Sequence, residues 1–436
     1  MFLAVGGMLG TRVQGHATAA TASTCAMDTV PTPGSVSVRG MTRRISIPGL
    51  GRAAGLAATL AGTLAVAVAV PAAGGWLSSA AVPTGADAVR MNQIQVMGAH
   101  NAYHREQQGA ELQATMGIDP GYPSWGWYSH ASIPDQLQRQ HLRGLELDLY
   151  PDPEGGRYRY PLARQRAGLG PIDDQAMAAP GIKVLHVADV DYTSSCRTFV
   201  GCLRQVADWS RTHPRHVPIF LQLELKQTDD RWEQFGGAVS PPWDAPQLDT
   251  VDTEIRSVFT EQELITADDL RRPGLTLEQS VLDQGWRTLS WARGKVLCFF
   301  DNGGPGTIRD TYLAGRSNLE GRAVFTRGNP GDPDAAITMV NDPRGANAEV
   351  IRDLVSRGYL VRTRSDEPLS TVRNQEFSRV ATALTSGAQL VTTDFPTVGM
   401  AARYHSDFVA ELPGAVVARC NPVTAGRGCR TDRLER

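Results

Sequence analysis

The sequence lacks the features that mark proteins of nucleotide and nucleic-acid metabolism. Neither a G-x-G-x-x-G fingerprint nor a Walker loop stands where a predicted strand turns into a helix, which argues against a bound nucleotide cofactor. No charge of one sign dominates, since 43 Lys and Arg face 45 Asp and Glu and the formal net charge is -2. A chain without a basic field is not expected to bind nucleic acid.

Cysteine is scarce, with six residues in 436. Cys196 lies close to Cys202, and Cys420 lies close to Cys429; in an exported protein such short spacings favour two disulfides. The alternative is that these four thiols stay reduced. Cys298 lies inside an apolar run, where we expect a buried free thiol.

One long apolar run, rich in Ala, Val and Leu, occupies residues 53–70. Two arginines precede it and small residues follow, so 41–80 is predicted to be a signal peptide of a secreted protein. The run is also about long enough for an uncleaved membrane anchor. If Met41 is the true start, residues 1–40 are an extension absent from the mature protein. Residues 88–436 are expected to form one catalytic barrel with a C-terminal tail.

Apolar patterns after the leader predict strands that alternate with helices. This order is typical of a parallel α/β structure, and about eight strands favour a closed (β/α)8 barrel over an open doubly wound sheet. The expected strands cover 93–99, 144–150, 182–187, 218–226, 295–300, either 323–326 or 336–340, 359–363 and 389–393. The expected helices cover 134–141, 199–212, 251–259, 275–291, 346–357 and 371–386.

Two of these strands carry acidic residues opposite their leucines. Glu146 and Asp148 alternate with leucines in one strand, and Glu224 does so in the other. The outer face of a barrel strand packs under helices, so we expect the acids to point into the barrel. Buried carboxylates that lack partners are costly, and a divalent cation would relieve their repulsion. With the amide oxygen of Asn101, the set offers only oxygen ligands, which suits Ca²⁺ or Mg²⁺ rather than zinc.

The alternative for these acids is a lattice of ion pairs with basic residues at the same strand ends. Lys226 follows one of the acidic strands, and Arg362 and Arg364 alternate on one face of a later strand. Guanidinium groups also suit phosphate oxygens. All three residues are therefore candidates for substrate binding as well as for pairing with the acids.

His100 and His186 end different predicted strands, and we expect them to face each other across the barrel mouth. Two histidines beside a metal suit general acid–base transfer of a phosphoryl or acyl group. The remaining candidates are expected to be structural; they are His130, His141, His213, His216 and His405.

Taken in order, these strand-end residues resemble those of calcium-dependent phosphoinositide-specific phospholipase C, and most closely the exported bacterial members. The segments YLVRTRSDEP and AQLVTTDFP also resemble late strands of the wider superfamily of phospholipase C-like phosphodiesterases. The resemblance covers roughly residues 90–400 and implies a distorted TIM (β/α)8 barrel. The matching positions are His100-Asn101, Glu146-x-Asp148, His186 and Glu224.

The resemblance implies a role for each of these residues. His100 would stabilise the phosphoryl group in the transition state, and His186 would protonate the leaving glycerolipid oxygen. The 2-hydroxyl of inositol would attack phosphorus, with Glu146 or Asp148 as base, and give a cyclic phosphate. We expect a monomer that acts on a phospholipid or other phosphodiester at a membrane surface. The implied Ca²⁺ ligands are Asn101, Glu146, Asp148 and Glu224.

Two other functions are considered. Glycerophosphodiester phosphodiesterases and sphingomyelinase D-like lyases share the barrel, but the former usually carry His-Arg where this chain has His100-Asn101. A barrel kept only as a binding or surface protein would be expected to have lost a catalytic-type residue, and none of the six is missing.

Overall fold

The computed structural model describes residues 85–436, apart from 229, 304–305, 368 and 436. The predicted signal peptide and the extension before it lie outside the described residues. Within the described part, no helix has the length and apolar character needed to cross a membrane.

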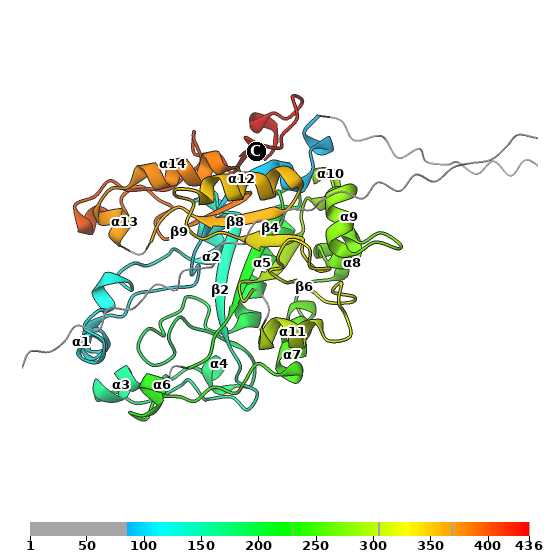
Figure 1. Ribbon diagram of the computed structural model, residues 1–436. Coiled ribbons are helices and arrows are strands. Elements are labelled where there is room, and N and C mark those ends of the chain that lie inside the picture. The colour runs from blue at the N-terminus through cyan, green and yellow to red at the C-terminus, as the bar shows by residue number, and fades with distance from the viewer. Residues whose placement is uncertain (1–84, 229, 304–305, 368, 436) are drawn as a thin grey trace, which may run out of the picture. The chain divides into compact units, whose positions relative to one another are not determined.

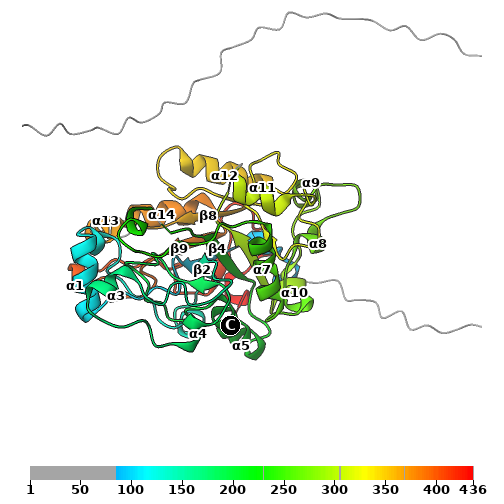
Figure 2. The same cartoon turned by 90° about the horizontal axis from the view of Figure 1, so that it is seen from below.

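Eight parallel strands form a nearly closed barrel with helices around it (Figures 1 and 2). The hydrogen-bonded order is β6-β5-β4-β2-β1-β9-β8-β7, and a parallel bridge between Arg327 and Ile337 links its two ends. The predicted α/β barrel is confirmed. Its strands are β1 (Ile94–Ala99), β2 (Gly144–Tyr150), β4 (Ile219–Leu225), β5 (Val296–Phe300), β6 (Val324–Phe325), β7 (Ile337–Met339), β8 (Leu360–Arg364) and β9 (Leu390–Thr393).

The prediction that 182–187 is a barrel strand is wrong. Only β3 (Lys183–Val184) is extended there, and it pairs antiparallel with the end of β2, while β2 pairs directly with β4. The chain then leaves the sheet because Val187 and Asp191 close a tight turn, each N–H donating to the other's carbonyl. The barrel still has eight strands, since both candidates for the sixth strand, β6 and β7, belong to it.

The acidic alternation of β2 points inward, as predicted. Glu146 contacts Arg362 of β8, and β8 is not a neighbour of β2 in the sheet, so this contact crosses the barrel interior. The three leucines of β2 are buried in the apolar core that also holds residues of the outer helices. At the crossing of β1 and β2, Gly98 pairs with Gly144. A Cβ on Gly98 would lie 2.9 Å from the Gly144 Cα. Because that atom is backbone and cannot move aside as a side chain can, Gly98 has no room for a larger residue.

Two predicted helices are interrupted. The segment 275–291 forms α9 (Leu277–Asp283) and α10 (Leu289–Ala292), with Gly285 between them at φ 73°. The segment 371–386 is divided at Gln375, whose φ is 52°. A right-handed helix cannot continue through a left-handed residue. The other helices are α1 (Gly109–Ile118), α2 (Ile133–Gln138), α3 (Leu162–Arg166), α4 (Gln175–Ala178), α5 (Phe199–Thr212), α6 (Asp230–Glu233), α7 (Ala245–Arg256), α8 (Ala267–Leu270), α11 (Thr307–Leu313), α12 (Asn347–Arg357), α13 (Ser370–Arg373) and α14 (Phe377–Ser386).

Both predicted disulfides are confirmed. One joins Cys196, in the loop after β3, to Cys202 of α5, and the other joins Cys420 to Cys429 in the C-terminal tail. The thiol of Cys298 is free and buried, as expected. The tail begins with β10 (Ala418–Cys420), which pairs antiparallel with β1.

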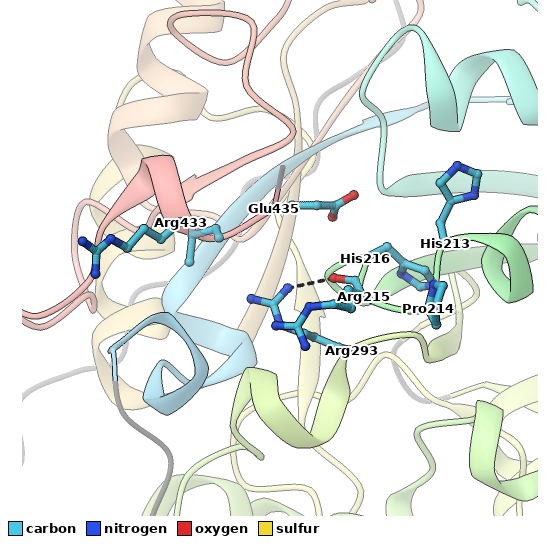
Figure 3. Close-up of a pocket in the computed structure, with 8 residues that line it drawn as sticks. His213, Pro214, Arg215, His216, Arg293, Arg433 and Glu435 are labelled. Atoms are coloured by element: carbon cyan, nitrogen blue, oxygen red, sulfur yellow. Dashed lines mark hydrogen bonds between the residues drawn. The ribbon is translucent and has the colours of Figure 1, made fainter.

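A cavity of about 720 Å³ lies at the amino-terminal end of the barrel (Figure 3). Arg293 donates a hydrogen bond to the Arg215 carbonyl across it, at 2.9 Å. His213 follows the end of α5, with its Nδ1 2.8 Å from the Trp209 carbonyl of the last turn. Arg215 lies three residues after the helix, and its positive charge complements the negative helix end. We interpret these basic groups as helix-end partners. The lining residues are His213, Pro214, Arg215, His216, Arg293, Arg433, Leu434 and Glu435.

Candidate active site

A second cavity, of about 520 Å³, opens at the carboxyl-terminal end of the barrel strands. Aromatic side chains, including Trp125, Tyr128 and Trp232, form part of its wall. Cavities at this end of an α/β barrel are where such folds carry their chemistry. The predicted site residues that line it are His100, Asn101, His186, Glu224, Lys226 and Arg364.

Carboxylates, some fully buried and some partly exposed, gather near this cavity. Glu146, Glu224 and Asp301 each place a carboxyl oxygen within 4.8 Å of the other two. Asp148 is the cross-strand neighbour of Glu224. The sequence showed Asp301 only as the residue after a strand, and its place beside the other acids follows from the pairing of β4 with β5. The structure therefore adds Asp301 to the candidate ligands.

The donor atoms fit a hard cation such as Ca²⁺. Asn101 Oδ1 and Asp148 Oδ1 are buried and accept no hydrogen bond from the described residues. Asp148 Oδ2 is buried as well, with Lys226 Nζ 3.4 Å away. The amide of Asn101 is oriented because its Nδ2 donates to the Tyr128 hydroxyl at 3.1 Å. Carboxylate and amide oxygens are the ligands that Ca²⁺ prefers. Such an ion would be held by the predicted set, Asn101, Glu146, Asp148 and Glu224, with Asp301 beside them.

Burial makes the ionised forms of Glu146, Asp148 and Asp301 unfavourable, so nearby positive charge would stabilise them. Burial raises the pKa of Glu146 and that of Asp148 well above their usual values, although Arg362 and Lys226 respectively act against the shift. Burial also raises the pKa of Asp301. Each group would ionise fully only with further positive charge nearby.

Some of the ion pairs that were considered as an alternative to a bound metal are present. Arg362 donates to Glu146 at 2.9 Å, and Lys226 Nζ lies 3.4 Å from Asp148 and 3.2 Å from Glu224. Arg362 is only 1% exposed and does not line the cavity, so contact between its guanidinium and a substrate stays a prediction. Lys226 and Arg364 do line the cavity.

His100 is fixed by the sheet. It follows the end of β1, and its Nδ1 lies 2.7 Å from Asp394 Oδ1 at the end of the neighbouring β9. A carboxylate only accepts, so Nδ1 carries the hydrogen. Arg364 donates to the other oxygen of Asp394 at 3.3 Å. Burial, helped by the charge of Arg364, lowers the pKa of His100 to about 3, which makes the ring neutral near pH 7. His130 donates to the His100 carbonyl, a structural contact.

His186 is fixed by a loop. It lies between β3 and α5, where its Nδ1 is 2.7 Å from Asp191 Oδ2. The same oxygen is 2.7 Å from His104 Nε2. Burial lowers the pKa of His186, against the effect of Asp191. Burial disfavours charge on His104 and Asp191 too, but their attraction raises the pKa of His104 and lowers that of Asp191 to about 2.

Sequence reasoning missed the partners of both histidines. Asp394 was recognised only as the end of the last strand, and neither Asp191 nor His104 was assigned a role. The one available signal was position, since Asp191 lies five residues after His186 and His104 lies four after His100.

Comparison with known proteins identifies the family to which the chain belongs. The family model of Ca²⁺-dependent phosphoinositide phospholipase C matches residues 89–422. The chain belongs to this family. The resemblance seen in the strand-end residues is thereby confirmed, and the chain is an enzyme of the phospholipase C type, which cleaves phosphodiesters.

Solved structures of enzymes with this description are similar to the chain at low sequence identity. The calcium-dependent phosphoinositol-specific phospholipase C of a Pseudomonas species is 16% identical with a TM-score of 0.46, covering 78% of this chain and 98% of that chain. The enzyme of Streptomyces antibioticus is 18% identical with a TM-score of 0.45, covering 71% and 96%. No curated protein matches the chain.

Proposed function

We propose that this protein is a secreted, Ca²⁺-dependent phospholipase C that cleaves the glycerol–phosphate bond of phosphatidylinositol. One observation carries the proposal. Two histidines, each held by a carboxylate, share a single cavity with the amide of Asn101 and the carboxylate of Glu224. This combination offers acid–base groups beside hard-cation ligands, which phosphodiester cleavage requires.

Calcium, when bound, would neutralise phosphate charge and lower the pKa of the attacking hydroxyl. Glu146 or Asp148 would accept the proton of that hydroxyl, the 2-hydroxyl of inositol. The new bond from this oxygen to phosphorus would give a cyclic inositol phosphate.

The histidines would act on the phosphate and on the leaving group. The negative charge of a bound phosphodiester, added to that of Asp394, would favour the protonated form of His100, whose Nε2–H would then donate to a phosphoryl oxygen. His186, with its Nδ1–H held by Asp191, would take up a second proton from solvent at Nε2. As the imidazolium it would deliver that proton to the diacylglycerol oxygen as the bond from phosphorus breaks.

The substrate would be met at a membrane surface, with the enzyme as a monomer. Phe235 and Val239 are exposed at 56% and 54%. They follow α6, whose Arg231 and Trp232 line the cavity. Arg166 lies 6.0 Å from the Phe235 ring, and Arg157 donates to the Val239 carbonyl. Apolar side chains flanked by arginines suit the surface of an anionic bilayer.

This surface can be tested separately from the chemistry. F235A/V239A should weaken binding to phosphatidylinositol vesicles about tenfold or more, while hydrolysis of a soluble inositol phosphodiester is unchanged. V350A on α12, a site 48% exposed, is the matched control and should bind like the wild type. Equal vesicle binding by all three proteins would reject this surface.

The overall function is tested by the release of water-soluble phosphate ester from a panel of lipids. Phosphatidylinositol should be cleaved in Ca²⁺ and spared in excess chelator, with an inositol cyclic phosphate as first product. Cleavage of sphingomyelin or of glycerophosphodiesters in preference would support the rival enzyme classes instead.

A further inference from the structure

A second histidine lies buried behind His186. His104 Nε2 is 2.7 Å from Asp191 Oδ2, the same oxygen that lies 2.7 Å from His186 Nδ1. The His104 ring is 0% exposed and stacks on Tyr128, with the ring centres 4.4 Å apart. A side chain without an exposed surface cannot touch a substrate, so His104 can act only through its neighbours. Its ring contacts with Tyr128 and with the edge of His186 would be kept by another aromatic ring. Its hydrogen bond to Asp191 would not.

The hydrogen-bond directions in this cluster are determined. Because a carboxylate only accepts, both histidines must donate to Asp191, His186 from Nδ1 and His104 from Nε2. Tyr122 donates to the other carboxyl oxygen at 3.2 Å. The Nδ1–H form of His186 leaves its Nε2 as the nitrogen available to the cavity that His186 lines.

The backbone holds both sides of the cluster. The segment around His104 pairs with the segment after Asp191, since Ser195 N–H donates to the Tyr103 carbonyl and Arg105 N–H to the Thr193 carbonyl. The turn that closes between Val187 and Asp191 holds the carboxylate next to His186. Asp191 is thus fixed between two anchored histidines.

A metal ion among the three residues does not fit the distances. Tetrahedral zinc ligands at about 2.0–2.1 Å from the ion lie roughly 3.3 Å from each other. The two nitrogen–oxygen distances here are 2.7 Å, the length of charge-assisted hydrogen bonds. The three side chains are therefore held together by hydrogen bonds.

We propose that His104 is a positioning residue that acts through Asp191 to keep His186 in the Nδ1–H form, with Nε2 facing the substrate. The inference rests on the proposed function, in which His186 protonates the leaving oxygen. Without His104, Asp191 would lose one of its two ring donors, and the carboxylate and the ring of His186 could rotate away from the productive geometry.

Two variants test this role. H104F keeps a ring against Tyr128 but removes the donor, and it should lower kcat on phosphatidylinositol roughly 10–100-fold, as for other orienting partners of functional histidines, with little change in KM. H104Q restores an N–H donor and should recover part of the loss. H216F is the control, because His216 is also buried but bonds Ser210 at the far end of the barrel; it should lower Tm without lowering kcat.

A substrate with a good leaving group separates positioning from general damage. On a nitrophenyl ester of inositol phosphate, protonation by His186 is hardly needed. H104F should therefore lose less than about threefold on this ester. An equal loss on lipid and ester, or no loss on lipid, would overturn the proposal.

Nitrogen NMR of histidine-labelled, Ca²⁺-loaded protein provides a readout independent of activity. His186 should carry its hydrogen on Nδ1 in the wild type and in H104Q, and should become a mixture of forms in H104F. An Nε2–H form of His186 in the wild type would refute the assignment. Failure of the wild type to cleave phosphatidylinositol would instead reject the proposed function and leave the NMR result to decide the role of His104.

Discussion

The two histidines at the barrel mouth are held in contrasting ways. His100 is fixed by the barrel itself, because Ala99 of β1 pairs with Thr393 of β9 and the next residues are His100 and Asp394. His186 lies outside the barrel sheet, on a loop held by a turn and by His104. The second partner of Asp394 is Arg364, and that of Asp191 is His104. One histidine therefore depends on strand register and the other on a local loop, although both bind their carboxylate through Nδ1.

The largest expected effect comes from removing each ring. H100A and H186A should each lower kcat on phosphatidylinositol by about 10²–10⁴-fold, the usual contribution of general acid–base groups, with Tm nearly unchanged. A nitrophenyl ester should partly restore H186A but not H100A, because only His186 protonates the leaving group. Normal turnover in both variants, or unfolding of both, would show that the histidines are structural.

The two disulfides are expected to affect catalysis differently, because one lies beside the loop of His186 and the other in the C-terminal tail. C196S/C202S and C420S/C429S should each lose roughly 2–3 kcal/mol of unfolding free energy, since both bonds close short loops. Only C196S/C202S should also lower kcat, because Cys196 follows the loop of His186. Chemical denaturation and initial rates measure the two effects, and an equal effect of both double variants on kcat would contradict the difference between the regions.

A smaller effect is expected from Glu254, which accepts a hydrogen bond from the Ile182 N–H just before β3 at 2.9 Å. Burial raises its pKa to about 7. A raised carboxyl pKa means that the folded state binds more protons between pH 4.5 and 7, so stability falls as pH rises through this window. E254Q keeps an oxygen acceptor and should gain roughly 1–2 kcal/mol over the wild type at pH 8 and little at pH 5. Denaturation at the two pH values checks this, and a gain that is equal at both would count against the assigned pKa.

Alternation in the sequence was enough to predict the inward acids. In β2 and β4 every second residue is leucine, and a barrel buries that face under helices, so the placement of Glu146 and Asp148 followed directly. The same reasoning wrongly predicted a barrel strand at 182–187. The apolar residues there run into a turn that is closed by the pairing of Val187 with Asp191, and the sequence pattern does not show this pairing. The order of polar residues after the predicted strands was enough to predict the family, although His186 lies on a loop rather than at a barrel strand end.

The partners of the site residues could not be predicted, since they come from distant parts of the chain. Asp394 reaches His100 only through the pairing of β1 with β9, and Asp301 joins the acids only through the pairing of β4 with β5. His104 meets Asp191 because two loops pair outside the sheet. A single sequence contains no record of such register.

The central claim is that inward oxygen ligands hold a calcium ion between the two histidine regions. Calorimetric titration of the chelator-treated enzyme tests it most directly. The account predicts one Ca²⁺ site per chain in the wild type, at least about tenfold weaker binding in E146Q with an unchanged fold, and activity that returns with Ca²⁺ and poorly with Mg²⁺, which prefers smaller octahedral sites. Full activity in excess chelator, or Ca²⁺ binding that E146Q leaves unchanged, would contradict it.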